Sequence, residues 1–464
     1  MDNPGKYLLC IDVGTSSVKA ACVDQEGRAE GLSREPVLFA EHELLAFPPG
    51  RWTEAMRSLI ARMPMRGLVA GVIVSGNGPT LVPLDGDGHE IGPALMWVDN
   101  RAHRIDGQPS FFLPKAAWMR DTDPASFERV RTFVSCPEYL GFILTGNAVT
   151  VTPSADFSPY IWTNEGIDAY RMDRGLFPPF VHPGDMTGTV SLQASATYGL
   201  PAGIPVFAGG SDFLMSLLGT ATVVPGRTCD RAGTSEGINA CSSHPISDRR
   251  LRSLPHVIPG LFNNAGILTS TGRMFEWFRG ISGQTHVNYD MMLRDVVHLE
   301  HGRDIPWFFP TLRPGETWEF SRGMFIGLGP MHGREEMGRA VVESIGYSVR
   351  EAIELLEENG EDISDLRASG GQAKNVVWNQ MKANIVGKPI LVPRVEDAEL
   401  VGNAAAGFFG LGAYQSLAEA AETLVHIKAE YLPDTEEHNR FTARYQEYLH
   451  VYQKLREGLR GLQQ

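Results

Sequence analysis

Short apolar runs separated by polar turns dominate the first half of the chain, which is the pattern of buried β-strands. A first run covers residues 7–11, and the polar stretch 12–17 separates it from a second run at 18–23. Residues 24–27, Asp-Gln-Glu-Gly, supply the next turn. Later strand-like runs lie at 68–74, 81–84 and 204–208, with helix- or loop-like stretches between them. The pattern predicts an α/β arrangement that opens with a β-hairpin.

A long amphipathic helix stands out in the second half. Apolar residues recur every four positions from Met337 to Ile353, and Gly360 is placed to end the helix. The pattern then predicts a strand at 366–368, a helix near 376–386, a strand at 390–392 and a helix of mixed charge from about residue 436. The second half is therefore also α/β.

The two halves share a short internal repeat. Residues 10–16, Cys-Ile-Asp-Val-Gly-Thr-Ser, resemble residues 229–235, Cys-Asp-Arg-Ala-Gly-Thr-Ser, at an offset of 219. The same offset relates Ala21 to Ala240 and Cys22 to Cys241. Two similar hairpins favour a duplicated domain, with chance similarity as the alternative. Asp12 is matched by Arg231, so only the first copy carries an acid.

Composition narrows the choice of partners. A chain of 464 residues suggests two or three domains, and 43% hydrophobic with 21% charged residues is ordinary for a globular protein. The net charge of −14 argues against nucleic acid and against anionic membranes, which bind clustered Lys and Arg. A neutral substrate stays open, as does a nucleotide whose phosphates meet backbone N–H groups and Mg²⁺.

The number and spacing of the cysteines and the lengths of the apolar runs indicate in which cellular compartment the protein is expected. No apolar run approaches the roughly 18 residues that span a bilayer, and residues 1–6 lack the layout of a secretory signal. Five cysteines without a CxxC motif argue against a disulfide framework or a zinc site. We therefore expect a cytoplasmic protein whose cysteines are core residues.

Both hairpin turns have the composition of a phosphate cradle. Gly14, Thr15 and Ser16 form the first turn, and Gly233 and Thr234 lie in the second. Consecutive N–H groups in such turns surround phosphate oxygens, and an adjacent acid can hold Mg²⁺. Asp12 occupies that adjacent position. The alternative is a pair of ordinary hairpins with good turn residues.

A further acid follows the strand at 204–208. Asp212 comes after Gly209, Gly210 and Ser211, and a helix-like run begins at residue 213. The carboxyl end of a strand is where ligands gather in α/β folds. Asp is also a common helix N-cap, so either role, or both, fits this position.

Taken together, these segments resemble the FGGY family of carbohydrate kinases over nearly the whole chain. The similar elements, in order, are Asp12–Lys19, Trp97–Arg101, Glu138–Gly146, Ala208–Asp212, Gly233–Ser235, Gly323–Glu343 and Ser369–Asn375. The resemblance implies two RNase-H-like domains of the actin and hexokinase type, 1–245 and 246–464, with an active-site cleft between them. It implies ATP and Mg²⁺ as cofactors and, since relatives are often dimers, a homodimer as one assembly.

The resemblance also assigns roles. Asp212 would be the general base, and Asp12, with Asp212, would hold Mg²⁺. The turn residues would contact phosphates, and Gly370, Gly371 and Asn375 would line the adenosine pocket. We expect the substrate at Asn77, Gly78, Asp99 and Asp212.

The chain departs from the family near the substrate. Residues 75–80, Ser-Gly-Asn-Gly-Pro-Thr, lack the His that relatives place on the sugar, and Phe213 follows the base where some relatives have a polar residue. A ketopentose such as xylulose is the acceptor that the resemblance favours, with gluconate or a smaller polyol as alternatives. Asp99 either meets sugar hydroxyls or pairs with Arg101, and Lys19 either lies near phosphate or is an exposed strand residue.

Two other classes fit part of the pattern. Gly233, Ser235 and Gly237 satisfy G-x-S-x-G, the serine-hydrolase elbow, which requires a helix after the serine. Residues 238–241 instead resemble a returning strand. A non-catalytic, actin-like nucleotide-binding regulator would share the fold. Asp212 discriminates between the two, because a pure binder has no need of an acid at the strand end, and its presence together with Asp12 favours an enzyme.

Overall fold

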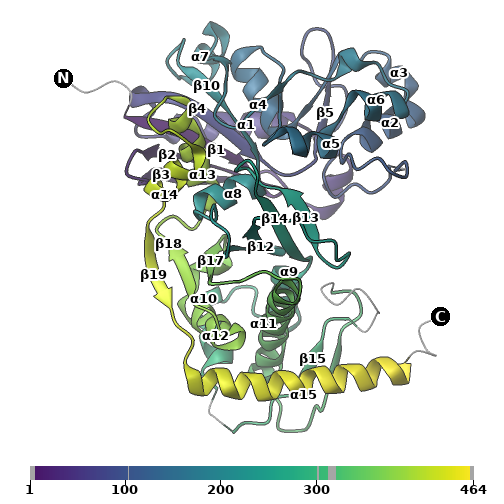
Figure 1. The fold of residues 1–464 in the computed structure, drawn as a ribbon, viewed down its shortest axis with the longest axis vertical. Helices are drawn as coiled ribbons and strands as arrows, with labels where there is room; N and C mark the ends of the chain where they lie inside the picture. Colours follow the sequence, from purple (N-terminus) through teal and green to yellow (C-terminus); the bar gives the residue numbers. More distant parts are fainter. Residues whose placement is uncertain (1–5, 103, 300–301, 312–319, 460–464) are drawn as a thin grey trace. The chain divides into compact units, whose positions relative to one another are not determined.

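The computed structural model describes residues 6–102, 104–299, 302–311 and 320–459 (Figure 1). The chain forms two compact units. Unit 1 contains residues 1–223, 255–260 and 398–426, and unit 2 contains residues 224–254, 261–397 and 427–464. The units therefore differ from the expected domains 1–245 and 246–464: the division comes at Val223, and residues 398–426 return to unit 1.

Unit 1 is built on a six-stranded sheet of order β3-β2-β1-β4-β10-β9. Strands β1, β4 and β10 are parallel, and β2, β3 and β9 are antiparallel to their neighbours. The sheet strands are β1 (Tyr7–Val13), β2 (Ser17–Asp24), β3 (Ala29–Pro36), β4 (Val69–Gly76), β9 (Met186–Thr189) and β10 (Pro205–Ser211). The minor strands are β5 (Leu81–Leu84), β6 (Thr132–Ser135), β7 (Thr150–Val151) and β8 (Phe180–Val181).

Some helices of unit 1 pack on this sheet, and others lie in the connections between its strands. The α-helices are α1 (Gly50–Arg62), α2 (Leu113–Thr122), α3 (Pro124–Phe127), α4 (Cys136–Thr145), α5 (Ser158–Ile161), α6 (Asn164–Ala169), α7 (Leu192–Tyr198), α8 (Asp212–Gly219), α13 (Ala398–Gly410) and α14 (Leu417–Leu424). The 3-10 helices are η1 (Glu41–Leu45), η2 (Arg66–Leu68), η3 (Ala155–Phe157) and η4 (Arg174–Leu176). Every residue of β1 is buried, which explains its uninterrupted apolar sequence.

Unit 2 contains a seven-stranded sheet of order β13-β14-β12-β11-β17-β18-β19. Its strands are β11 (Arg227–Ala232), β12 (Glu236–Ser242), β13 (Arg252–Pro255), β14 (Phe262–Leu268), β17 (Asp365–Ser369), β18 (Ile390–Pro393) and β19 (Ile427–Tyr431), and a separate pair is β15 (Trp307–Phe309) with β16 (Met324–Ile326). Its helices are α9 (Thr271–Ile281), α10 (Tyr289–Val297), α11 (Arg334–Glu358), η5 (Gln372–Lys374), α12 (Val376–Val386) and α15 (Thr435–Leu459).

The two sheets share one topology. In each, three antiparallel strands are followed by two strands parallel to the first, in the orders β3-β2-β1-β4-β10 and β14-β12-β11-β17-β18. This is the arrangement expected of RNase-H-like domains. The predicted duplication and α/β class are therefore confirmed at the level of topology.

The offset of 219 does not hold after the hairpin turn. Val13 pairs with Val18 in the first hairpin, whereas Ala232 pairs with Glu236 in the second, so the second turn is one residue shorter. Consequently Ala21 pairs with Cys10, but the partner of Cys229 is Asn239 rather than Ala240. The matches at Ala21/Ala240 and Cys22/Cys241 are therefore not equivalent sheet positions.

The long helices follow the predicted apolar stripes. Helix α11 buries the stripe from Val341 to Leu356, and Asn359 caps it before Gly360, whose φ of +95° suits glycine. Helix α12 has the predicted bounds. The C-terminal helix α15, yellow in Figure 1, contributes Tyr445 to the same core, and its ring lies 5.3 Å from that of Tyr347 at a tilted angle. Unit 2 thus has one continuous core around α11.

Two glycines explain how α13 is held in unit 1. A Cβ on Gly219 of α8 would lie 1.7 Å from the carbonyl oxygen of Ala398, and one on Gly402 would lie 1.9 Å from that of Met215. The backbones of α8 and α13 therefore approach each other more closely than any side chain would allow. This packing brings the first turns of α13 beside the middle and the end of α8.

Burial of His256 makes stability depend on pH. Burial lowers the pKa of His256 from 6.5 to about 4, and its Nδ1 accepts the N–H of Ile258 at 3.0 Å. Between these two pH values the unfolded chain takes up a proton that the folded protein excludes. We therefore expect stability to fall as pH drops from about 6.5 to 4, by on the order of 3 kcal/mol in all. The His256→Asn variant should flatten this part of the curve in urea unfolding; an unchanged slope would contradict the assignment.

All five cysteines are buried, as predicted for most of them, and none is in a disulfide. No helix in the described ranges has both the length and the hydropathy that crossing a bilayer requires. Residues 1–5, part of the segment assessed for a secretory signal, lie outside the described residues.

Candidate active site

The first hairpin turn uses its glycine internally. The N–H of Gly14 donates to the carbonyl of Ser17 at 2.9 Å, so this glycine shapes the turn. The Thr15 hydroxyl accepts from the indole N–H of Trp97 at 2.9 Å and keeps its own hydrogen to donate. Ser16 is exposed. Thr15 and Ser16, rather than Gly14, therefore present hydroxyl donors at this turn.

Asp12 is a buried acid within a group of other acids. Its Oδ1 accepts from the hydroxyl of Ser75 on β4 at 2.8 Å. Burial raises the pKa of Asp12 to about 7; the carboxylate of Glu399 adds to this, Lys19 opposes it, and Asp212 contributes in the same direction as Glu399. A site with this excess of carboxylate oxygens stabilises a hard divalent cation. The donor set therefore fits Mg²⁺.

Helix α13 supplies two polar residues to this site that the sequence reasoning missed. Glu399 lies 3.8 Å from the ammonium of Lys19, and Asn403 donates both to the Ser75 hydroxyl at 2.9 Å and to the carbonyl of Ile11 at 3.0 Å. The side chain of Lys19 is only 15% exposed, so its interpretation as an exposed strand residue is wrong. A signal was available: an acid and an amide four positions apart in an otherwise apolar helix share one face.

Asp212 is the first residue of α8, directly after β10, and is 9% exposed. The cap position is taken by Ser211, so the interpretation of Asp212 as the N-cap is wrong. Its negative charge raises the pKa of Asp12 and, after burial, that of Cys136, so it lies close to both. A carboxylate in the first turn of a helix is stabilised by the helix dipole.

The residues expected at the substrate are largely bonded to the protein. Asn77 is 2% exposed; its amide donates to the carbonyl of Val13 at 3.1 Å, and its oxygen accepts from Thr80 at 2.5 Å. Gly78 is half-buried, with room for a Cβ 3.8 Å from Trp97. Asn77 therefore shapes the loop after β4, whatever else it contacts.

Asp99 forms the ion pair that was one of its two interpretations. Arg101 donates to both oxygens of Asp99, at 2.9 and 2.6 Å, and stacks on Trp118 at 4.3 Å. Burial opposes ionisation of Asp99, but the bonds from Arg101 outweigh it and lower its pKa. Lys115 donates to the Asp99 carbonyl at 3.0 Å. The carboxylate is therefore ionised and fixed in place.

Phe213, the residue after Asp212, belongs to a cluster of aromatic side chains. The ring of Phe213 lies 6.5 Å from that of Phe157, which contacts Tyr160 at 5.5 Å, and Tyr160 contacts Phe111 at 5.8 Å. Aromatic faces pack on the C–H surfaces of small organic ligands. This part of unit 1 therefore presents apolar surface next to a carboxylate.

The second hairpin also bonds its turn glycine within a shorter turn, but it lacks an acid at the position that corresponds to Asp12. The N–H of Gly233 donates to the carbonyl of Ser235 at 2.8 Å, as Gly14 does to Ser17, and the carbonyl of Thr234 accepts from the N–H of Arg273 at 3.2 Å. Strand β12 follows the turn directly, so Ser235 is not on a strand-to-helix elbow. The serine-hydrolase alternative is wrong.

The predicted adenosine segment lies against this second turn. Gly370, with φ +85°, has no room for a side chain, since a Cβ would lie 2.5 Å from the carbonyl of Ala232. Gly371 faces open space. Asn375 caps α12 by accepting the N–H of Trp378 at 2.8 Å, and its amide also donates to Asp290. Unit 2 thus places the turn and the glycine segment side by side.

Family models match both parts of the chain. The N-terminal domain model of the FGGY family of carbohydrate kinases matches residues 104–219, and the C-terminal domain model matches residues 231–411. The chain belongs to the FGGY family of carbohydrate kinases. The resemblance seen in the sequence is therefore confirmed, and the family's activity is that of a phosphotransferase with an alcohol group as acceptor.

Relatives cover almost the whole FGGY chain. A xylulose kinase of Lactococcus lactis is 27% identical over 97% of both chains. An L-xylulose/3-keto-L-gulonate kinase of Escherichia coli is 26% identical over 96% of both. The crystal structure of a xylulose kinase from Rhodospirillum rubrum superposes with a TM-score of 0.81 at 22% identity, over 98% of this chain and all of the other. The predicted two-domain kinase fold is confirmed.

Proposed function

We propose that this protein transfers the γ-phosphoryl group of Mg-ATP to a hydroxyl of a small sugar or polyol, with a ketopentose such as xylulose as the favoured acceptor. The observation that carries the proposal is the pair of buried acids in unit 1. Asp12 is the last residue but one of β1, before a glycine-hydroxyl turn, and Asp212 is the first residue of α8 and lies close enough to perturb Asp12. A pure nucleotide binder has no need of the second acid.

Each proposed role follows from the position of the residue. Asp212 accepts the proton of the attacking hydroxyl, a step worth roughly 10²–10⁴-fold in rate. Asp12, with Asp212 nearby, would hold Mg²⁺, and the charge that this ion supplies when bound would neutralise phosphate charge. Thr15, Ser16 and the Gly233–Thr234 turn bind phosphate oxygens, while Gly370, Gly371 and Asn375 form the adenosine side.

The acceptor is proposed from the relatives and limited by the site. The relatives named above are kinases of xylulose or of a keto sugar acid. Asn77 and Asp99 already bond within the protein, and Phe213 follows the proposed base. Gluconate and smaller polyols therefore remain alternative acceptors. The buried cysteines, none of which is in a disulfide, suit a reducing compartment, and we propose a cytoplasmic location. We also propose a homodimer, because relatives in the family are often dimers.

A coupled ADP-release assay tests the proposal. With Mg-ATP and a panel of ketopentoses, polyols and sugar acids, we expect one acceptor to give a kcat/KM in the range of roughly 10⁴–10⁸ M⁻¹s⁻¹. The response should require both Mg²⁺ and the acceptor. ATP binding without turnover on any acceptor would favour the non-catalytic, actin-like alternative.

A further inference from the structure

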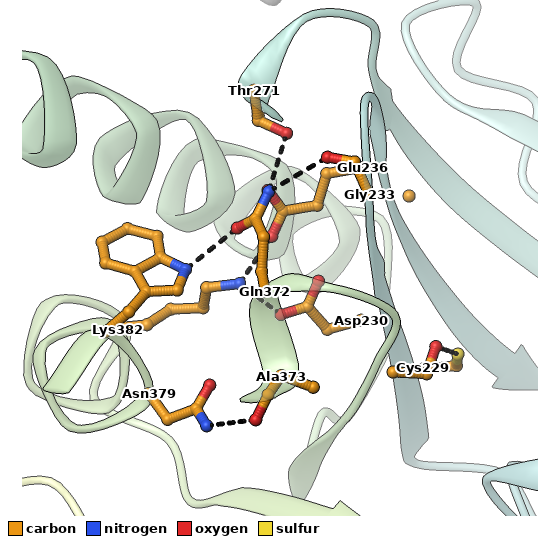
Figure 2. A network of polar contacts seen from close by, with 12 residues as sticks. Cys229, Asp230, Gly233, Glu236, Thr271, Gln372, Ala373, Asn379 and Lys382 are labelled. Carbon is orange, nitrogen blue, oxygen red and sulfur yellow. Dashed lines mark hydrogen bonds and ion pairs between the residues drawn. The ribbon is translucent and has the colours of Figure 1, made fainter. Parts of the chain in front are cut away.

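Unit 2 contains a fully buried group of three charges beneath the second turn. The ammonium of Lys382 lies 2.6 Å from Oδ2 of Asp230 and 2.6 Å from Oε1 of Glu236 (Figure 2). The three side chains are 2%, 0% and 0% exposed. Moving charged side chains from water into the protein interior costs much free energy. A fully buried group of this kind therefore needs a specific structural or functional explanation.

The two acids lie on the two strands that flank one turn. Asp230 lies on β11 before Gly233, and Glu236 begins β12 directly after Ser235. Glu236 pairs with Ala232, two residues after Asp230, so both carboxylates project from the same face of the hairpin. A single ammonium on α12 therefore bridges both strands.

A second set of contacts joins the same turn to the glycine segment. Gln372 donates to the carbonyl of Gly233 and to the hydroxyl of Thr271, both at 3.4 Å, and accepts from the indole of Trp378 at 2.9 Å (Figure 2). A Cβ on Gly272 would lie only 2.0 Å from the carbonyl oxygen of Gly233, so the start of α9 packs directly against the turn. The turn is thus held from α12, from η5 and from the start of α9.

The charges of the group balance. Burial raises the pKa of Asp230 to about 8, with Lys382 opposing and Glu236 adding to the rise, whereas the pKa of Glu236 is lowered and that of Lys382 raised. With a proton on Asp230 the group is neutral near pH 7. Apolar residues of similar size often stabilise a core as well as a buried ion pair does, so stability alone does not require these three residues.

We propose that Lys382 is a positioning residue that fixes the Gly233–Ser235 turn for the phosphates of the nucleotide. Through Asp230 and Glu236 it holds the turn on helix α12, whose N-terminus is capped by Asn375. The phosphate side and the adenosine side of unit 2 then keep a constant spacing. The inference rests on the proposed function, because it takes this turn as a phosphate site.

Two variants separate positioning from folding. Lys382→Met leaves the Glu236 carboxylate and Asp230 buried without their counter-charge and should destabilise the protein. The triple variant Asp230→Asn, Glu236→Gln, Lys382→Met removes all three charges together and should fold, as a cooperative thermal transition shows. Lys388→Met is the matched control: this lysine also pairs with a carboxylate, Glu357 at 2.6 Å, and is 26% exposed.

The experiment compares the affinities of the full chain for ADP and for adenosine, each measured by calorimetric titration. In the triple variant we expect ADP affinity to fall about 10–100-fold, the loss typical of removing an outer partner of a binding group, with adenosine affinity unchanged. The KM for ATP should rise and the acceptor KM should not. The control variant should match the wild type.

The other possible outcomes show whether the positioning role or the proposed function is wrong. An equal loss of ADP and adenosine affinity, or ADP affinity like that of the wild type, would overturn the positioning role and leave the proposed function standing. A wild-type protein that binds neither ligand would overturn the proposed function and this inference with it.

Discussion

The Asp212→Asn variant is expected to lose kinase turnover by about 10²–10⁴-fold while still binding ADP. The amide has the shape of the carboxylate but cannot accept the proton of the attacking hydroxyl. Because Asp212 is the first residue of α8 and Ser211 occupies the cap position, the substitution leaves the cap residue unchanged. The helix should therefore form as before, and the loss should appear in kcat.

Steady-state kinetics on the best acceptor, with ADP calorimetry on the same preparations, measure both quantities. Asp168→Asn is a matched control, since this acid pairs with Arg174 at the surface of unit 1. The control should keep normal turnover. Turnover at the normal rate in Asp212→Asn would show that another group takes the proton.

The second large effect is expected at Asp12. In Asp12→Asn the carboxylate that would hold Mg²⁺ is gone, and we expect kcat/KM for Mg-ATP to fall by about 10–100-fold. The Mg²⁺ concentration needed for half-maximal rate should rise. Mg²⁺ should also strengthen ADP binding less than it does in the wild type, which calorimetry with and without the ion measures.

Stability distinguishes this loss from unfolding. The pKa of Asp12 is raised from 3.8 to about 7, so the folded protein loses stability as pH rises between these values, and the loss is complete once the acid ionises beside Glu399 and Asp212. An amide removes this loss. Above pH 7 and without metal, Asp12→Asn should therefore melt at the wild-type temperature or higher. An unaltered Mg²⁺ dependence in a stable variant would refute the metal role.

Local patterns were sufficient to predict most of the fold. The apolar stripe of α11, the runs that became β1 and β2, and the bounds of α12 follow from periodicity and turn residues, which act between near neighbours. The repeat also revealed the duplication, because its Gly-Thr-Ser turn survived in both copies. The return of residues 398–426 to unit 1 was not predictable this way, since it depends on close contact of α8 with α13.

The sequence by itself thus determined the α/β class, the duplicated topology, the kinase family and the positions of Asp12 and Asp212 at the ends of strands. Only the tertiary structure decided which groups surround them. Glu399 perturbs Asp12, and Asn403 donates to its partner Ser75, both from a helix far along the chain; Lys382 reaches Asp230 across 152 residues. Charge interactions and burial depend on distance in space, and a sequence records only distance along the chain.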